Sequence, residues 1–214
     1  MTTMSQVIPH WNPEDPGFWQ REGERVARRN LWISIGVLTV AFAVWMVWSV
    51  VVVHLPAAGF RYSTNQLYWL AALPALSGAM LRFVYAFAVP VFGGRRWTAI
   101  ATAILLVPAL GIGYAVQDPD TPYEWMVVLA LLAGLGGANF ASSMAHVSFF
   151  YPKARVGTAL ALNAGLGNLG VPLAQVVVPV AIGVGTLGSA GFVWVPLIVV
   201  AALVAWFGMH DLAE

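Results

Sequence analysis

The sequence predicts an all-α membrane protein built from six transmembrane helices. Of its 214 residues, 60% are hydrophobic and only 9% are charged, whereas a soluble domain carries about 25% charged residues. The hydrophobic residues gather in six runs, and a helix needs roughly 20 such residues to cross the hydrocarbon core. Short connections separate the runs, so consecutive spans are expected to run antiparallel.

Residues 1–30 form a polar N-terminal tail that contains several prolines. No cleavable signal peptide is visible, because these residues are polar and the first apolar run is too long for a signal sequence. The stretch Gln20–Asn30 carries four arginines and could form a short amphipathic helix on anionic headgroups. A solvated tail that orients the first span is the simpler interpretation, and we favour it.

The six spans fill residues 31–207, which we expect to form one transmembrane bundle. The predicted spans are Leu31–Val53, Tyr68–Val91, Trp97–Ala115, Trp125–Phe150, Gly157–Val184 and Phe192–Phe207. The last of these is the shortest. Ten tryptophans agree with anchoring at the two membrane interfaces.

Basic residues predict the orientation of the bundle. Eight of the ten Lys and Arg residues lie in the tail, in the second connection or in the fourth connection. Arg61 alone lies in a connection on the opposite side. Because basic connections face the cytoplasm, both termini are predicted to be cytoplasmic.

The tenth basic residue, Arg82, lies inside the second span. It is nine residues from the predicted end of that span, or ~14 Å along the helix, which is too deep for easy snorkelling. An arginine near the bilayer centre costs about 2.5–3.5 kcal/mol even on the mildest insertion scale. All nine acidic residues lie outside the predicted spans, so no carboxylate there can offset that cost.

A small anion is therefore the expected partner of Arg82. A guanidinium presents a planar fork of donors, which suits a planar oxyanion such as nitrate, nitrite or a carboxylate. Gly78 and Ala86, at helical spacing from Arg82, are expected to leave room for this ligand. The alternative is an arginine satisfied by backbone carbonyls or by polar side chains of neighbouring helices.

The fourth span carries a polar stripe and one aromatic candidate. Asn139, Ser143 and His146 lie at i, i+4 and i+7, with Phe140 at the edge of the stripe. Phe140 is either ordinary core packing or a flat wall against a planar anion. His146 could carry a coupling proton, although a neutral hydrogen-bonding role is more common for such a residue.

The fifth span is rich in glycine and ends in a proline-containing segment. Gly165 and Gly167 allow close packing and local bending, and Pro172 removes a backbone donor one turn later. Such a helix could slide or flex during a conformational cycle. Asn168 offers an amide near the glycines, either to a ligand or to a neighbouring helix.

Several classes of protein are excluded by what the spans lack. The chain has no cysteine, so disulfides, thiolate metal sites and cysteine nucleophiles are ruled out. No span carries paired carboxylates, a nucleophile with its base or a cluster of metal ligands, so an enzyme is not expected. No cofactor, metal or nucleic acid is predicted, and the expected surroundings are a lipid bilayer.

The stretch from Gly136 to Val171, GGANFASSMAHVSFFYPKARVGTALALNAGLGNLGV, resembles the nitrate/nitrite porter family of the major facilitator superfamily. It is similar to that family's fourth-span motif followed by its nitrate signature in the fifth span. Phe92–Arg96, FGGRR, resembles a degenerate form of the superfamily's loop motif that lacks the acidic residue. The resemblance implies the N-terminal six-helix half of this fold, formed by 3+3 inverted repeats, with residues 208–214 starting the cytoplasmic linker between halves.

The resemblance also implies roles for individual residues. The family's substrate-binding arginine corresponds to Arg82, its pocket phenylalanine to Phe140 and its fifth-span asparagine to Asn168. The glycines linked to helix sliding correspond to Gly157, Gly165 and Gly167. His146 stands where a polar residue that does not titrate is expected.

The implied function is transport of nitrate or nitrite across a bacterial cytoplasmic membrane by alternating access. The family binds its substrate between two six-helix halves, so a second half, in the same chain or a separate one, is an expected partner. We expect this sequence to be part of a twelve-span porter. Nitrate/nitrite exchange is favoured over proton symport because no predicted span contains a carboxylate. A porter for another small organic anion and a non-transporting membrane subunit remain as alternatives.

Overall fold

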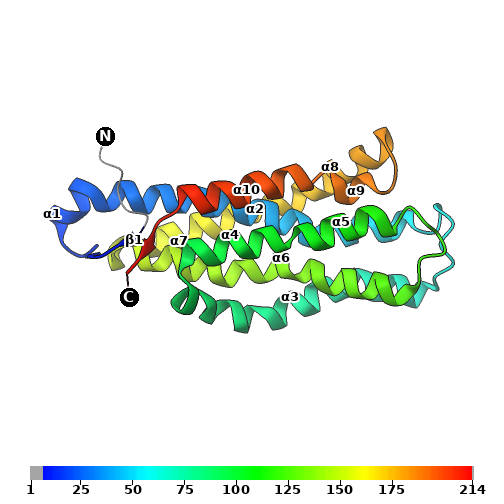
Figure 1. The fold of residues 1–214 in the computed structure, drawn as a ribbon, viewed down its shortest axis with the longest axis horizontal. Coiled ribbons are helices and arrows are strands. Elements are labelled where there is room, and N and C mark those ends of the chain that lie inside the picture. Colours follow the sequence, from blue (N-terminus) through cyan, green and yellow to red (C-terminus); the bar gives the residue numbers. More distant parts are fainter. Residues whose placement is uncertain (1–6, 214) are drawn as a thin grey trace.

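The computed structural model describes residues 7–213, which form an elongated bundle of roughly parallel and antiparallel helices (Figure 1). The described residues contain six helical passes that are long and apolar enough to cross a membrane, which confirms the predicted number. The passes are Pro16–His54, Thr64–Phe92, Gly94–Ala115, Tyr123–Phe150, Lys153–Val184 and Ser189–Gly208. Most begin a few residues before the predicted spans, because polar residues extend the helices beyond their apolar parts.

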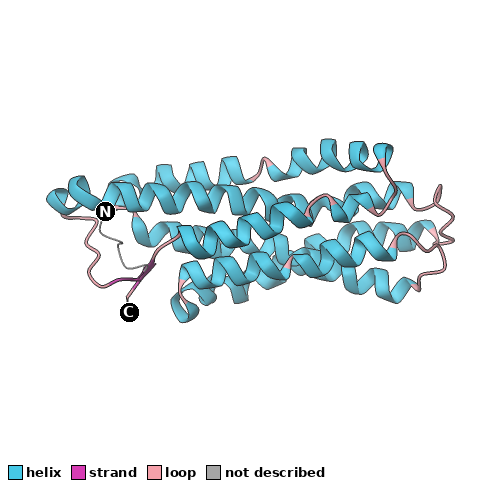
Figure 2. Ribbon diagram, turned by 45° about the horizontal axis from the view of Figure 1, so that its top comes forward, coloured by secondary structure: helices cyan, strands magenta, loops and turns pink. Residues whose placement is uncertain are grey.

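Several passes consist of more than one helix. The helical elements are α1 (Pro16–Phe18), the π-helical turn η1 (Trp19–Gly23), α2 (Glu24–His54), α3 (Thr64–Phe92), α4 (Gly94–Ile104), α5 (Leu106–Ala115), α6 (Tyr123–Phe150), α7 (Lys153–Gly167), α8 (Gly170–Val184), α9 (Ser189–Phe192) and α10 (Val195–Gly208). Two short parallel strands, β1 (Val7–Ile8) and β2 (Asp211–Leu212), pair with each other. The strands lie at the end of the bundle that carries both termini (Figure 2), which we call the termini end.

The stretch Gln20–Asn30 extends the first span and is not a separate surface helix. Helical backbone is continuous from Pro16 to His54. Trp19, Val26 and Ala27 on this extension are buried in a cluster with Phe150 at the end of α6. The division into a tail (1–30), a bundle (31–207) and a linker (208–214), like the cytoplasmic location of the termini, stays a prediction.

Prolines explain three breaks inside the spans. A proline cannot donate a hydrogen bond to the carbonyl four residues earlier. Pro108, Pro172 and Pro196 therefore release the carbonyls of Ile104, Asn168 and Phe192. These positions coincide with the end of α4, the residue after α7 and the end of α9. The sequence predicted local bending near Pro172, and the structure shows an interruption of the helix at Asn168–Leu169.

The helices α3 and α6 pack closely against each other at Gly134. A Cβ on Gly134 would overlap the Ser77 hydroxyl and lie 2.7 Å from the backbone nitrogen of Gly78. Across this contact the Ser77 hydroxyl donates to the Leu131 carbonyl at 2.9 Å. Small residues let two backbones meet in this way within a membrane, so the glycines of α6 position α6 against α3.

At the termini end, the segment after α10 folds back onto the bundle. The Asp211 carboxylate accepts a hydrogen bond from the Arg95 backbone nitrogen (2.6 Å) and lies 3.5 Å from the Arg95 guanidinium. Asn30 binds the backbone of His210 through both its amide oxygen and its amide nitrogen. Burial, followed by the nearby cations of Arg29 and Arg95, lowers the pKa of His210 and so favours the neutral imidazole.

Gly93 allows the turn before α4 to lie against the segment that contains Asp211. Its φ of 82° lies in the left-handed region that favours glycine. A Cβ there would also lie 3.0 Å from the Asp211 carboxylate. The turn FGGRR, which lacks an acidic residue of its own, therefore binds an acidic residue from the segment after α10, Asp211.

We predict that Asp211→Asn lowers the apparent melting temperature of the detergent-solubilised protein. Asp211 is only 5% exposed, and removing its charge weakens hydrogen bonds to a charged group that are worth about 1.5–3 kcal/mol each. Asp120→Asn is the matched control, because Asp120 is exposed in a connection. Equal melting temperatures for both variants would show that the Asp211 contacts contribute little.

Candidate functional site

Arg82 of α3 points toward α6 and keeps most of its donors unused. Its Nε–H donates to the Gly137 carbonyl at 3.2 Å, and its guanidinium carbon lies 5.2 Å from the centre of the Phe140 ring. A guanidinium has five N–H donors. The other four make no hydrogen bond to any residue that the structure describes. One backbone contact thus orients the side chain, while its terminal fork remains available to an anion.

Phe140 contacts both Arg82 and the first span. Its ring is nearly parallel to that of Phe42 on α2, with the ring centres 6.1 Å apart and the planes 20° apart. Phe42 is buried and also packs against Trp45, at 5.4 Å between ring centres. The structure therefore brings together two predicted site residues, Arg82 and Phe140. Phe42 of α2 packs against the Phe140 ring and helps to hold it in place.

The expectation that Gly78 leaves room for a ligand is wrong. A Cβ on Gly78 would lie 3.0 Å from the Gly134 carbonyl and 3.4 Å from the Trp45 indole nitrogen. Gly78 is therefore a helix-packing residue, since α6 occupies the space beside it. Ala86, the other small neighbour of Arg82, is exposed.

Asn168 lies at the break between α7 and α8, on a face that the described residues leave uncovered. Its side-chain nitrogen donates to the Ala164 carbonyl one turn earlier, at 2.8 Å. The residues that share this face at spacings of three or four are all exposed: Ala161, Gly165, Asn168, Pro172 and Gln175. The structure records no contact between Asn168 and Arg82 or Phe140, so a shared ligand for the three stays a prediction.

The three glycines predicted to permit helix sliding differ in their surroundings. A Cβ on Gly157 or Gly165 would meet nothing within 4 Å, whereas one on Gly167 would press on the Leu38 side chain. Gly167 therefore permits close contact between α7 and α2, and the other two face open space. Their role in sliding stays a prediction.

His146 is buried at the termini end of α6. Its Nε2 makes no hydrogen bond within the described residues, and its ring packs 4.9 Å from that of Phe150. The imidazole occupies the position where a Cβ of Gly94 would lie. Proton coupling through His146 stays a prediction.

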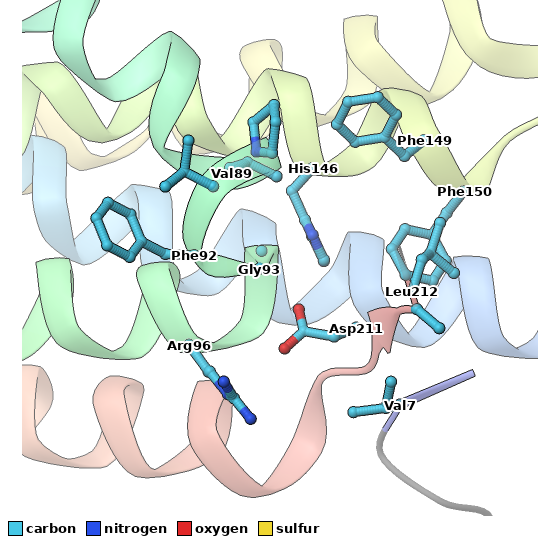
Figure 3. A pocket seen from close by; sticks show the side chains of 14 residues that line it. Val7, Val89, Phe92, Gly93, Arg96, His146, Phe149, Phe150, Asp211 and Leu212 are labelled. Carbon is cyan, nitrogen blue, oxygen red and sulfur yellow. The ribbon is translucent and has the colours of Figure 1, made fainter. Parts of the chain in front are cut away.

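His146 also lines a cavity of about 460 Å³ together with Arg96, Phe149 and Asp211 (Figure 3). In this view the His146 ring and the Asp211 carboxylate approach the turn at Gly93 from different elements. Neither Arg82 nor Phe140 lines the cavity. The candidate anion site at Arg82 is therefore separate from this cavity.

Two residues of a buried polar network escaped the sequence analysis. The hydroxyls of Ser34 and Ser143 lie 2.8 Å apart, and the Asn163 amide donates to Ser143 at 2.6 Å. The network joins α2, α6 and α7. Asn163 lies five residues before Asn168, on the other side of the helix, and its complete burial was not apparent from the spacing of polar residues alone.

Comparison with known proteins gives one consistent family. The sequence model of the Major Facilitator Superfamily matches residues 33–212. The chain is 50% identical to the nitrate/nitrite transporter NarU of Escherichia coli (strain K12), over 97% of this chain and 49% of that protein. It is 42% identical to the probable nitrate/nitrite antiporter NarK2 of Thermus thermophilus, over 93% of this chain and 49% of that protein. The chain thus spans about half the length of these relatives, and the predicted resemblance to nitrate/nitrite porters is confirmed.

Proposed function

Because the chain belongs to the major facilitator superfamily, we propose that it forms one half of a nitrate/nitrite transporter that works by alternating access. The observation that carries this proposal is Arg82, a cation inside the second pass that contacts Phe140 and has four N–H donors without a partner among the described residues. A planar anion can accept two parallel hydrogen bonds from such a fork. The relatives are named as transporters, which agrees with the prediction that the chain is not an enzyme.

A second six-helix half completes the site in this proposal. The exposed face of α7 and α8 that includes Gly165 and Asn168 is the surface expected to meet it. Binding of the anion reduces the repulsion between Arg82 and a basic residue supplied by the second half, and so favours closure. A ligand drives such closure only through its different affinity for the open and closed states.

Exchange of nitrate for nitrite is the mode that we favour, in a bacterial cytoplasmic membrane. No carboxylate among the described residues pairs with Arg82, so a bound anion supplies its counter-charge. In exchange, each anion that is released on one side of the membrane is followed by another that binds for the return step. Proton symport is the second candidate, because His146 is a buried titratable group whose Nε2 has no partner in the described part of the chain.

Counterflow in proteoliposomes tests the proposal on the protein with both halves. We expect nitrate uptake to require internal nitrite and to be unaffected when a protonophore removes the pH gradient. Uptake driven by the pH gradient without internal nitrite would establish symport instead. Failure to transport either anion under both conditions would overturn the proposed function.

A further inference from the structure

Asn139 is a buried amide whose side chain lacks a hydrogen-bond partner within residues 7–213. It lies on α6 and is only 5% exposed. Neither its side-chain oxygen nor its side-chain nitrogen bonds to any described residue. An unpaired polar group in the protein interior costs about 1–3 kcal/mol. Such a group in a native structure calls for a partner that the protein chain itself does not supply.

A small void lies beside Asn139. Its volume is about 10 Å³, and residues of α2, α4 and α6 line it: Ser34, Val37, Leu38, Thr98, Asn139, Ser142 and Ser143. Five of these seven residues are polar. The Thr98 hydroxyl, which comes from α4, makes no hydrogen bond to a described residue. The void is thus polar and lies next to unused donors and acceptors.

We propose that this void binds one water molecule, which bridges Asn139 to the Thr98 hydroxyl and to the serine hydroxyls around it. A buried water typically makes about three hydrogen bonds to groups that would otherwise be unpaired. The volume is that of a single water, so it excludes nitrate and larger ligands. Residues of this half alone form the site, so it does not depend on the anion site or on a second half.

A metal cation fits this void less well than water. The lining contains hydroxyls and one amide but no carboxylate, and an unneutralised charge is costly at this depth. An empty void is also disfavoured, because cavities that stay dry are lined by apolar side chains. Water is therefore the ligand that the chemistry of the lining selects.

A double-mutant cycle tests the bridge through melting temperatures of the full chain in detergent. Thr98→Val keeps the shape of the side chain and removes its hydroxyl. We expect it to lower the apparent melting temperature by about 2–4 °C. In the background of Asn139→Leu the same change should have much less effect, because the water has already lost its anchor. Thr98→Ser, which keeps the hydroxyl, should change the melting temperature little in either background.

Thr102→Val is the control, because the Thr102 hydroxyl donates to the Thr98 carbonyl at 2.6 Å and does not line the void. Its effect should be the same with and without Asn139. Equal effects of Thr98→Val in the two backgrounds would overturn the proposal. If Asn139→Leu does not fold, high-resolution density decides: we expect a water within about 2.6–3.2 Å of the Asn139 amide, and an empty void between ordered side chains would refute it.

Discussion

Replacing Arg82 by lysine is expected to lower nitrate affinity by about 10- to 100-fold in the protein with both halves. The lysine keeps the positive charge but lacks the planar fork that can bind two oxygens of one anion. The loss of one hydrogen bond between charged groups is worth about 1.5–3 kcal/mol, and each 1.4 kcal/mol is a factor of ten. Lysine also cannot reproduce the Nε–H bond to Gly137 that orients the guanidinium.

Nitrate binding by isothermal titration calorimetry and nitrate uptake in proteoliposomes both measure this effect. Arg61→Lys is the matched control, because Arg61 is an exposed arginine in a connection. We expect Arg61→Lys to bind and transport nitrate normally. Near-normal affinity and uptake in Arg82→Lys would remove Arg82 from the anion site and with it the main support for the proposed function.

The spans, and the assignment of Arg82 and Phe140 to one site, were open to prediction because each depends on residues close in sequence or on a recognisable motif. Hydrophobic runs locate the spans, since the bilayer fixes their length. Proline marks a possible interruption because it removes a backbone donor within one turn, as before Pro172, although Pro74, Pro90 and Pro179 lie inside continuous helices. Arg82 was noticeable because a charge is rare at that depth, and the structure places it against Phe140.

The features that sequence reasoning missed depend on contacts between distant parts of the chain. Asp211 binds Arg95, which lies 116 residues earlier in the sequence. The strands β1 and β2 pair although they lie near opposite ends of the described residues. Gly78 looked like space for a ligand, but only the position of Gly134 shows that a helix fills that space. Periodicity identifies which residues share a face, but it does not identify what covers that face.

The contact at Gly134 provides the second prediction of large effect. Gly134→Ala would place a methyl group on the Ser77 hydroxyl, 2.7 Å from the Gly78 nitrogen and 2.8 Å from the Pro74 carbonyl oxygen. Two of these three atoms belong to the backbone of α3, so they cannot rotate away, and α3 and α6 must separate. Overpacking of this kind costs about 1–3 kcal/mol or more. We expect the apparent melting temperature in detergent to fall by at least about 5 °C.

Gly183→Ala is the matched control, because it is the same substitution at an exposed helical position where a Cβ would meet nothing within 4 Å. Alanine favours helix over glycine by up to ~1 kcal/mol, so this variant should be as stable as the unsubstituted protein or more so. Separation of α3 from α6 would also move Gly137 and Phe140 away from Arg82, so we expect Gly134→Ala to weaken nitrate binding as well. A Gly134→Ala protein with unchanged melting temperature and affinity would mean that the two helices are not in contact at this residue and that the orientation of Arg82 does not depend on their packing.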